Sequence, residues 1–330
     1  NFLNENVLHS KSLFEMASSN FDVLIVGAGF AGITAARELA ERGNKKVLVL
    51  ERHDHIAGNC YDCYDEAGVL IHQYGPHIFH TYNKRVYEYL SRFTEWRQYQ
   101  HCVVGDIHGM IMPIPFNLYS LHLAFEKEKA DRLEKKLIDT FGLNQKVPIL
   151  KLRESQDPEI LEVAEYVYEN VFLQYTMKQW GKKPSEIDPA VTGRVPVFLS
   201  RDNRYFQDPY QGMPLEGYTP LAQNMVNHPN ITIRYGVDCR DVLEINGSEV
   251  KFEGQVFKGI LIFTGQVDEL YDRRFGMLPY RSLDFVFETH NTDFYQQNSV
   301  VNYTIDKDYT RITEFKYLTG QDVPNKTTIV

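Results

Sequence analysis

Residues 21–52 read FDVLIVGAGFAGITAARELAERGNKKVLVLER. This stretch passes in order through an apolar strand, a glycine turn, an amphipathic helix, a second apolar strand and an acid. Gly27, Gly29 and Gly32 have the G-x-G-x-x-G spacing, and Glu51 follows 19 residues after the last of them. Such an arrangement is typical of a dinucleotide-binding β-α-β unit. We therefore expect a dinucleotide to bind at this turn.

Each part of the unit has a physical role. Gly27 permits the tight turn, Gly29 lets the backbone approach a pyrophosphate, and Gly32 lets the helix pack closely on the strand. The N-terminus of the helix offers free N–H groups and the positive end of its dipole to the phosphates. Glu51, at the end of the second strand, is placed to accept hydrogen bonds from ribose hydroxyls.

Composition narrows the class of protein. A chain of 330 residues is long for one domain. With 43% hydrophobic and 24% charged residues it can bury a sizeable core. The net charge of −9 argues against a general nucleic-acid or anionic-membrane binder. No apolar run approaches the roughly 18 residues needed to cross a bilayer. We expect neither nucleic acid nor a membrane as a partner.

The four cysteines are Cys60, Cys63, Cys102 and Cys239. They are too few for a disulfide scaffold of this size and fit a reducing cytoplasm. Cys60 and Cys63 form a C-x-x-C, but neither a second pair nor a nearby histidine cluster completes a zinc site. We expect no bound metal.

The rest of the chain alternates between helical and strand-like patterns. Helices are expected over 83–94, in several pieces over 117–175, and over 219–228. A strand is expected over 231–238, and hairpins are expected over 99–112 and 249–264. The tail from 281 to 330, which includes TRITEFKY, is expected to be rich in strands. Prolines at 184, 189 and 196 mark an irregular segment.

This order predicts an α/β fold: a discontinuous Rossmann-like FAD-binding domain with an inserted helical domain and an antiparallel β-sheet domain. A flavin is favoured over a nicotinamide because a strand ending in IFTG follows late in the chain and regular β-α-β units do not continue. The expected assignments are 1–20 as a tail outside the fold, 21–98 and 219–274 as the FAD-binding domain, 116–193 as the helical domain, and 99–115, 194–218 and 275–330 as the sheet domain.

Four segments carry side chains suited to chemistry. In YGPHIFHT, a turn at Gly75 presents His77 and His80, either as buried, hydrogen-bonded histidines or as a polar patch beside a bound ring. In QYTMKQWGKKPSEI, Tyr175 and Trp180 could stack on a base or sugar, although aromatic residues at this spacing more often form plain helix core.

The other two segments carry arginines. Arg194 precedes a proline in a glycine- and proline-rich stretch that continues to Arg201, Arg204 and Tyr205. A loop of this kind could close over a diphosphate, because guanidinium forks match phosphate oxygens. Arg311 lies centrally in DYTRITEFKY. For each of these segments a solvated surface arginine is an equally weighted interpretation.

Five separated segments behind the nucleotide unit resemble motifs of the UDP-galactopyranose mutase family. They are GPHIFHT, YTMKQWG, the run from RVPV through NRYF to YQGMPLEGYT, DRRFGMLPYRSL and YTRITEFKY, in this order. The resemblance extends from residue 21 to residue 330.

The resemblance implies a specific activity. That family holds FAD without a covalent link and interconverts UDP-galactopyranose and UDP-galactofuranose with no net redox change. The flavin must be reduced, and a covalent flavin–sugar iminium intermediate connects the two ring forms. A homodimer, an unidentified reductant and galactofuranose biosynthesis for cell-wall polysaccharide are implied as well.

The resemblance also implies roles for individual residues. His77 and His80 match a histidine pair at the flavin ring, and Arg194 and Arg311 match arginines on either side of the diphosphate; these four are the expected catalytic residues. The implied substrate contacts are Tyr205 on a phosphate, Tyr175 stacked on uracil, Trp180 near the sugar, Phe172 and Asn302 beside the uridine, and Arg194 and Arg311. The implied cofactor contacts are Gly27, Gly29, Phe30, Ala31, Gly32, Glu51, Arg52, Gly58, Asn59, His77, Val237, Thr264 and Gly265.

The chain departs from the family pattern in three places. Ala57 stands where the family usually has a second glycine, and Gln266 stands where proline is common. The family closes its flavin domain with a glycine- and arginine-bearing strand–helix turn rich in tyrosine, which is not found here. We therefore expect the sequence to be part of a longer protein and expect weak retention of FAD.

Two other functions fit parts of this pattern. A flavin oxidoreductase of the amine-oxidase type shares the N-terminal unit but has no need for paired arginines and aromatic residues that stack on uridine. An inactive nucleotide-sugar-binding fragment would bind the substrate without product formation.

Overall fold

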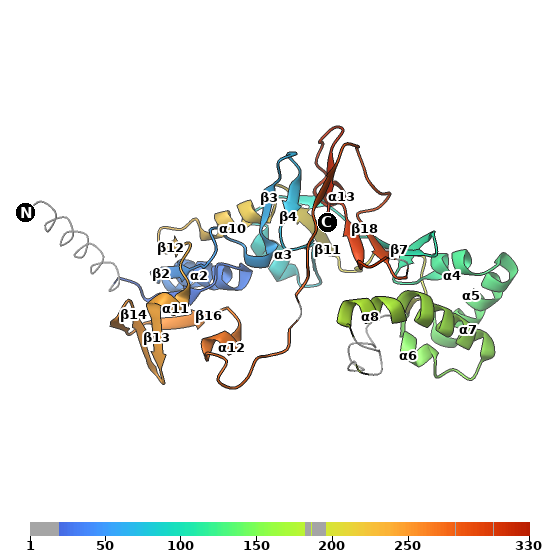
Figure 1. Cartoon of the computed structure of the whole chain (residues 1–330), viewed down its shortest axis with the longest axis horizontal. Helices are drawn as coiled ribbons and strands as arrows, with labels where there is room; N and C mark the ends of the chain where they lie inside the picture. Colours follow the sequence, from blue (N-terminus) through green and yellow to red (C-terminus); the bar gives the residue numbers. More distant parts are fainter. Residues whose placement is uncertain (1–19, 182–185, 187–195, 281, 306) are drawn as a thin grey trace, which may run out of the picture.

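The structure is a computed structural model that describes residues 20–181, 186, 196–280, 282–305 and 307–330. Figure 1 shows an elongated molecule, with the nucleotide-type β-α-β unit at one end and a group of helices at the other. A mixed sheet lies between them. Within the described ranges, no helix combines the length and apolarity needed to cross a membrane.

A four-stranded parallel sheet forms the first end. Its order is β12-β2-β1-β16, and all three pairings are parallel. The strands are β1 (Val23–Val26), β2 (Val47–Leu50), β12 (Ile231–Arg234) and β16 (Ile260–Phe263). Because β1 and β2 occupy the centre, every residue of both strands is buried, and both read as continuous apolar runs.

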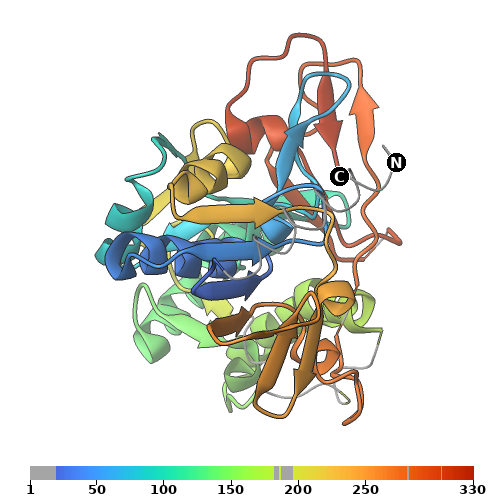
Figure 2. The same cartoon turned by 90° about the vertical axis from the view of Figure 1, so that its left-hand side faces the viewer.

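Two helices cover one face of this sheet. They are α2 (Phe30–Gly43) and α10 (Tyr218–Val226), which also contact each other. Figure 2 shows both beside the sheet. Ile33, Ala36 and Ala40 of α2 recur at helical spacing and are buried against Val23, Val47 and neighbouring strand residues. This packing places the N-terminus of α2 at the carboxyl ends of the strands.

Small sheets and a short helix join this unit to the rest. These elements are β3 (Asp62–Tyr64) paired with β4 (Leu70–His72), the sheet β5-β11-β6 (Phe79–Thr81, Tyr210–Pro214 and Trp96–Gln98) and the helix α3 (Lys84–Leu90). The sheet β13-β14-β15 (Leu243–Asn246, Glu249–Phe252 and Gln255–Phe257) instead packs on the parallel sheet, with Phe252 buried against Leu24 and Leu48. In β5-β11-β6, residues near 80, 97 and 212 are brought together from distant parts of the sequence.

The central sheet has the order β19-β18-β7-β8. Its strands are β7 (Val103–Ile107), β8 (Met110–Ile114), β18 (Val300–Tyr303) and β19 (Arg311–Thr313). The β7–β8 and β18–β19 pairings are antiparallel, whereas β18 and β7 run parallel. The sheet is therefore mixed.

The second end is helical. It contains α4 (Leu118–Ala124), α5 (Lys127–Phe141), α6 (Ile149–Leu152), α7 (Pro158–Val167), the π-helical segment η2 (Tyr168–Leu173) and α8 (Gln174–Trp180), with β9 (Lys146–Pro148) pairing with β10 (Pro196–Phe198). Asp157 caps α7 by accepting hydrogen bonds from the amides of Glu159 and Ile160, and Pro158 occupies the first turn.

Two sequence predictions need correction. The run 249–264 is not one hairpin: β14 and β15 pair with each other, but β16 leaves them to run parallel to β1. TRITEFKY is not one strand either, because β19 ends at Thr313 and α13 (Phe315–Thr319) follows. Phe315 and Leu318 are both fully buried at a helical spacing of three, which explains the change.

The remaining C-terminal elements pair locally. β17 (Glu288–His290) pairs antiparallel with β20 (Thr327–Ile329). Between β16 and β17 lies the short helix α12 (Val267–Leu270). The short helix α11 (Cys239–Val242) follows β12.

Candidate functional site

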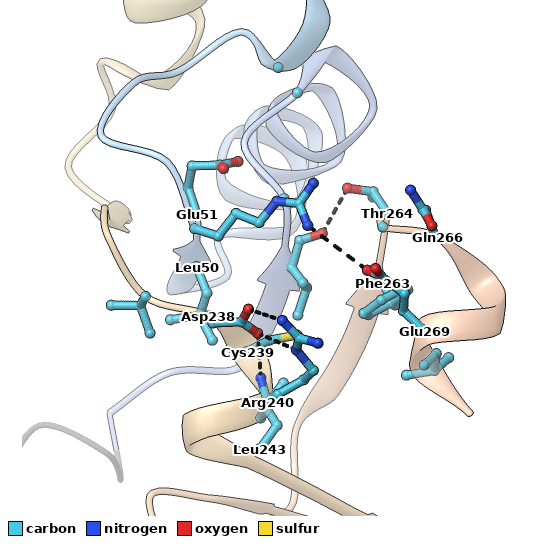
Figure 3. A pocket seen from close by; sticks show the side chains of 18 of the residues that line it. Leu50, Glu51, Asp238, Cys239, Arg240, Leu243, Phe263, Thr264, Gln266 and Glu269 are labelled. Carbon is cyan, nitrogen blue, oxygen red and sulfur yellow. Dashed lines mark hydrogen bonds and ion pairs between the residues drawn. The ribbon is translucent and has the colours of Figure 1, made fainter. Parts of the chain in front are cut away.

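A cleft of about 910 Å³ opens at the carboxyl ends of β1, β2 and β16 (Figure 3). Ligands of open α/β sheets bind outside the carboxyl ends of the strands, where the helices and loops diverge. The walls come from the glycine turn, the end of β2, α11, the edge of β13 and α12. This volume lies in the range of cofactor sites.

The floor of the cleft is a turn that accepts only glycine at its tightest points. Gly27 has φ +100°, and a Cβ there would lie 2.4 Å from Thr264 Oγ1. A Cβ on Gly32 would lie 1.9 Å from the Gly27 carbonyl oxygen, which is why α2 can sit so close to β1. Gly58 has φ +56° and packs against Gly29. A Cβ on Gly58 would lie 2.9 Å from the Gly29 Cα. The exposed backbone of this turn can approach a pyrophosphate.

Glu51 is buried at the end of β2, with 6% of its surface exposed. Its Oε2 accepts the Ala28 amide at 2.8 Å, and its Oε1 accepts the His53 amide and contacts His53 Nδ1, both at 2.9 Å. Oε2 thus braces the phosphate turn, and Oε1 holds the segment that follows β2. Each retains acceptor capacity, so a ribose hydroxyl would join an existing network rather than meet an isolated carboxylate.

Several residues in the cleft wall were not singled out from the sequence. Arg240 donates three hydrogen bonds to the Asp238 carboxylate, from its amide, Nε and Nη2, at 2.6–3.0 Å. These bonds lower the pKa of Asp238 to about 2. Glu269 was not singled out either; its Oε2 lies 4.0 Å from Nη1 of Arg52, a predicted cofactor residue. The D-x-R spacing after β12, with its capping aspartate, is a local signal that could have identified the first pair.

The structure brings most of the predicted cofactor residues to this cleft. Those that line it are Gly27, Gly29, Phe30, Ala31, Glu51, Arg52, Gly58, Asn59, Val237, Thr264 and Gly265. Gly32 lies behind the turn, and His77 does not line the cleft. The Val237 amide donates to the Glu51 carbonyl at 3.0 Å, so a cofactor contact there would use the Val237 carbonyl. These residues fit the adenosine diphosphate part of FAD.

Of the predicted histidine pair, His77 lies on the turn between β4 and β5, and His80 lies within β5. The His77 amide donates to His72 Nδ1 at 3.1 Å, and His77 Nδ1 contacts the Gly75 carbonyl at 2.9 Å. His72 is 1% exposed, and this burial lowers its pKa to about 3. A neutral, buried histidine therefore holds the turn that carries His77.

His80 points elsewhere. Its Nδ1 lies 3.2 Å from Asp208 Oδ2, and its ring stacks on Phe206 with 3.5 Å between centroids. His77 and His80, three residues apart, thus have different partners. His80 belongs with the loop before β11 rather than with the cofactor cleft.

A second polar group forms where α8 meets β19. The Arg311 guanidinium donates to the Tyr175 hydroxyl and lies 6.0 Å from the centre of its ring. Burial raises the pKa of Tyr205, and that pKa also responds to Tyr175 and Arg311, which lie close by. Asn302 pairs with Arg311 across β18 and β19, and its Oδ1 is buried with no hydrogen bond to any residue that the structure describes. Residues 175, 205, 302 and 311 are therefore neighbours.

Three other predicted substrate residues are placed differently or are not described. The Phe172 side chain is 2% exposed in the helical core, so its ring is not available at the surface and any uridine contact would come from its backbone. Trp180 ends α8, but its side chain lies outside the described part of the structure. Arg194 lies outside the described residues altogether.

Sequence inspection missed His101, which lies beside this second group. Its pKa falls to about 4, chiefly through burial and then through the charges of Arg311 and His80. No local pattern marks it, because its neighbours come from distant segments. Across the ranges that the structure describes, no three His, Cys, Asp or Glu side chains gather as a metal site.

Comparison with known proteins decides the family. Residues 170–330 match the family model described as UDP-galactopyranose mutase, and residues 25–93 match that of the NAD(P)-binding Rossmann-like domain. A dTDP-fucopyranose mutase of Escherichia coli is 40% identical over 308 residues, covering 90% of this chain and 77% of that protein. A probable UDP-galactopyranose mutase of Klebsiella pneumoniae is 36% identical over 301 residues, covering 91% and 74%.

The chain belongs to the UDP-galactopyranose mutase family. A crystal structure of reduced UDP-galactopyranose mutase matches its fold with a TM-score of 0.64 and 18% identity, over 94% of this chain and 73% of that one. As a member of a family of mutases, the chain is an isomerase with a flavin-type nucleotide domain. The resemblance found in the sequence motifs is thereby confirmed at the level of family and fold.

Proposed function

We propose that this protein interconverts UDP-galactopyranose and UDP-galactofuranose on reduced FAD, with no net redox change. One observation carries the proposal: a glycine-turn dinucleotide cleft and a Tyr175–Arg311–Tyr205 group occur together in a chain of the mutase family. An oxidoreductase of the amine-oxidase type would need the cleft but not the arginine and tyrosine group.

The cleft residues would hold the cofactor. The glycine turn and the N-terminus of α2 suit the pyrophosphate, and the network around Glu51 suits the ribose. When bound, the reduced flavin supplies the nucleophile for the anomeric carbon of the sugar. His77, on the turn fixed by His72, is the residue that we expect beside the flavin ring.

The second group would hold the nucleotide sugar. Tyr175 offers an aromatic face for uracil, Tyr205 offers a hydroxyl to a phosphate, and Arg311 offers a guanidinium fork to the diphosphate. Arg194, Trp180, Phe172 and Asn302 remain proposed contacts from the family resemblance. The buried, unpaired Oδ1 of Asn302 is consistent with a polar partner on this side of β18.

The residues of the chain act mainly by position and charge. Departure of UDP from the anomeric carbon leaves negative charge on the β-phosphate, which Arg311 and Arg194 would stabilise. Keeping UDP bound after it departs allows it to return to the same carbon once the sugar ring has closed in its other form. No residue of the chain has to change its oxidation state.

A second substrate is favoured by one observation. The relative at 40% identity is named a dTDP-fucopyranose mutase. Relative to UDP-galactose, that substrate has a methyl group on the base, no 2′-hydroxyl on the pentose and no hydroxyl on C6 of the sugar. We infer that the same site architecture serves either nucleotide sugar and that base and hydroxyl contacts decide between them.

We further propose that the enzyme works in the cytoplasm as a homodimer, takes electrons from an unidentified reductant and supplies galactofuranose for cell-wall polysaccharide. Support for a reducing compartment comes from the four cysteines, all of which are free thiols.

The test is an anaerobic assay with FAD, dithionite and either UDP-galactofuranose or dTDP-fucofuranose, with the pyranose product measured by HPLC. We expect kcat/KM to be higher for the UDP sugar. A higher value for the dTDP sugar would transfer the assignment to that substrate. Oxidation of either sugar would support the oxidoreductase, and binding without product would support an inactive binder.

A further inference from the structure

His55 lies at the centre of a stack of three rings beside the cofactor cleft. The centre of its ring lies 3.8 Å from that of Tyr61 and 5.0 Å from that of His53, and the planes of the rings are within 15° and 7° of parallel. His53 itself lines the cleft, where its Nδ1 contacts Glu51 Oε1 at 2.9 Å. The stack therefore holds the His55 ring in one orientation, next to the acid that is proposed to bind the ribose.

Both ring nitrogens of His55 have partners. Nδ1 lies 3.1 Å from the Ile56 carbonyl oxygen, and Nε2 lies 2.8 Å from the Tyr74 hydroxyl. A carbonyl can only accept, so Nδ1 of a neutral His55 carries the hydrogen and Nε2 accepts from Tyr74. Burial raises the pKa of Tyr74, and the hydroxyl therefore keeps the hydrogen that it donates. The direction of this hydrogen bond is thus defined.

The bond between His55 and Tyr74 joins two loops that are proposed to face different parts of the cofactor. On the His55 side, Gly58 follows three residues later, packs on the glycine turn and lines the cleft. On the other side, Tyr74 directly precedes the turn at Gly75, whose carbonyl contacts His77 Nδ1. The first loop belongs to the pyrophosphate end of the cofactor and the second to the flavin end. A single hydrogen bond therefore connects the two ends of the proposed site.

We propose that Tyr74 is a positioning residue for the turn that carries His77, and that His55 is its anchor on the phosphate loop. Through this bond the geometry beside the flavin ring depends on the loop that holds the pyrophosphate. The inference rests on the proposed function for the identity of the cofactor. It assigns no substrate contact to either residue. Breaking the bond should therefore alter the surroundings of the flavin and leave binding of the nucleotide sugar unchanged.

The first test compares Tyr74→Phe, which keeps the ring and removes the hydroxyl, with the unaltered protein. FAD affinity should fall about threefold to tenfold, the usual contribution of one hydrogen bond. The visible absorption bands and the midpoint potential of the bound flavin should both shift, because the turn of His77 is released. Tyr64→Phe, at a position on β3 that is 62% exposed, is the matched control and should change none of these readouts. Lower stability of Tyr74→Phe with an unchanged flavin spectrum and potential would show a purely structural bond and overturn the proposal.

The second test changes the anchor. His55→Phe keeps a ring that can stack on Tyr61 but removes the acceptor, and it should reproduce the changes of Tyr74→Phe. His55→Gln loses the ring but keeps an amide oxygen that can accept from Tyr74, so it should retain most of the original spectrum and FAD affinity. The opposite order of the two variants would show that stacking, not the hydrogen bond, is what matters, and would refute the proposal.

A double variant shows whether the two residues act through one bond. His55→Phe and Tyr74→Phe combined should lose no more FAD affinity than either change alone, whereas losses that add in full would show independent roles and contradict the proposal.

Kinetics separates positioning from substrate binding. In Tyr74→Phe, kcat should fall while KM for UDP-galactofuranose stays unchanged, and a higher KM at unchanged kcat would count against the proposal. FAD affinity, spectrum and potential are measured without turnover. Absence of mutase turnover in the unaltered, reduced protein would therefore reject the proposed function separately and leave these three measurements to decide the role of Tyr74.

Discussion

The Arg311 guanidinium donates a hydrogen bond to the hydroxyl of Tyr175, a residue 136 positions earlier in the chain. This contact joins β19 of the central sheet to α8 of the helical end. Both residues belong to the set proposed to hold UDP, Tyr175 on the base and Arg311 on the diphosphate. Because a guanidinium carries five N–H donors, Arg311 can keep this contact and still offer donors to a phosphate.

Arg311→Ala should lower kcat/KM, since it removes one electrostatic donor to the transition state. The expected loss of transition-state stabilisation is roughly 2–4 kcal/mol. Tyr175→Phe should cost less than about 1 kcal/mol, because it keeps the aromatic face and removes only the hydroxyl that accepts from Arg311. Both values come from initial rates with dithionite-reduced protein. Near-equal rates for Arg311→Ala and the unaltered protein would remove Arg311 from the site.

Gly32→Ala should impair FAD binding, because the new Cβ would lie 1.9 Å from the Gly27 carbonyl oxygen and force the phosphate turn to shift. Overpacking of this kind costs about 1–3 kcal/mol, which corresponds to a loss of affinity between about fivefold and a hundredfold. Titration of FAD followed by flavin fluorescence measures it.

Gly43→Ala is the matched control at the other end of α2. A Cβ there would meet only the flexible Lys45 side chain, at 3.3 Å. We expect unchanged FAD affinity and equal or slightly higher stability. Equal FAD affinity for Gly32→Ala would show that this turn does not bind the cofactor.

Stability should fall as pH falls from 7 to 5. Burial lowers the pKa of His72 to about 3 and, with the charges of Arg311 and His80, that of His101 to about 4, against about 6.5 in the unfolded chain. Protons therefore bind more tightly to the unfolded state below pH 6.5. By linkage, each histidine contributes stability that is present above pH 6.5 and decreases by about 2 kcal/mol at pH 5.

The measurement is the unfolding free energy from urea titrations at pH 7 and pH 5. His101→Gln should remove about half of the pH-dependent loss attributed to this pair, whereas the control His290→Gln should remove none of it. The same pH dependence in all three proteins would contradict the assignment.

Asp62→Ala should destabilise the fold by about 2 kcal/mol. The buried carboxylate accepts the amides of Tyr218 and Thr219 at 2.6 and 2.7 Å and so caps α10 from a distant segment. Its removal leaves two amides of a buried helix end without an acceptor. Asn83→Ala, which removes a cap from the exposed start of α3, should cost no more than about 1 kcal/mol. Equal losses in urea unfolding would show that burial of the cap is irrelevant.

The nucleotide unit could be predicted because its signal is local. Strand, turn, helix and acid follow one another within 21–52, and each glycine has its own steric reason. Apart from Gly32, which lies behind the turn, the cofactor residues predicted between Gly27 and Asn59 all line one cleft. Their contacts with FAD remain predictions.

The sequence predictions that proved wrong concern segments whose structure depends on contacts between distant residues. Alternation in TRITEFKY suggested one strand, but Glu314 is fully buried, accepts the amides of Tyr295 and Gln296, and stands at the start of α13. In the same way β16 leaves its neighbouring hairpin because β1, more than 200 residues earlier, offers a buried parallel edge. A local sequence pattern does not reveal either of these distant partners.

The second group shows the same limit. Tyr175, Tyr205 and Arg311 were named through family motifs, and their proximity became visible only once α8 and β19 were placed together. His101 had no motif at all: one of the charges that lower its pKa belongs to Arg311, in a distant part of the sequence. Phe172 was expected to contact the uridine from the family resemblance alone, which does not show that its ring is buried in the helical core.

The most direct test of the central claim is anaerobic turnover by protein whose bound FAD has been verified from its spectrum. Reduced protein should convert UDP-galactofuranose to UDP-galactopyranose on HPLC, with the flavin still reduced at the end and no conversion by the oxidised form. UDP-galactofuranose left unchanged by the reduced, FAD-bound protein, or oxidised with a matching change in the flavin, would contradict the assignment as a UDP-galactopyranose mutase.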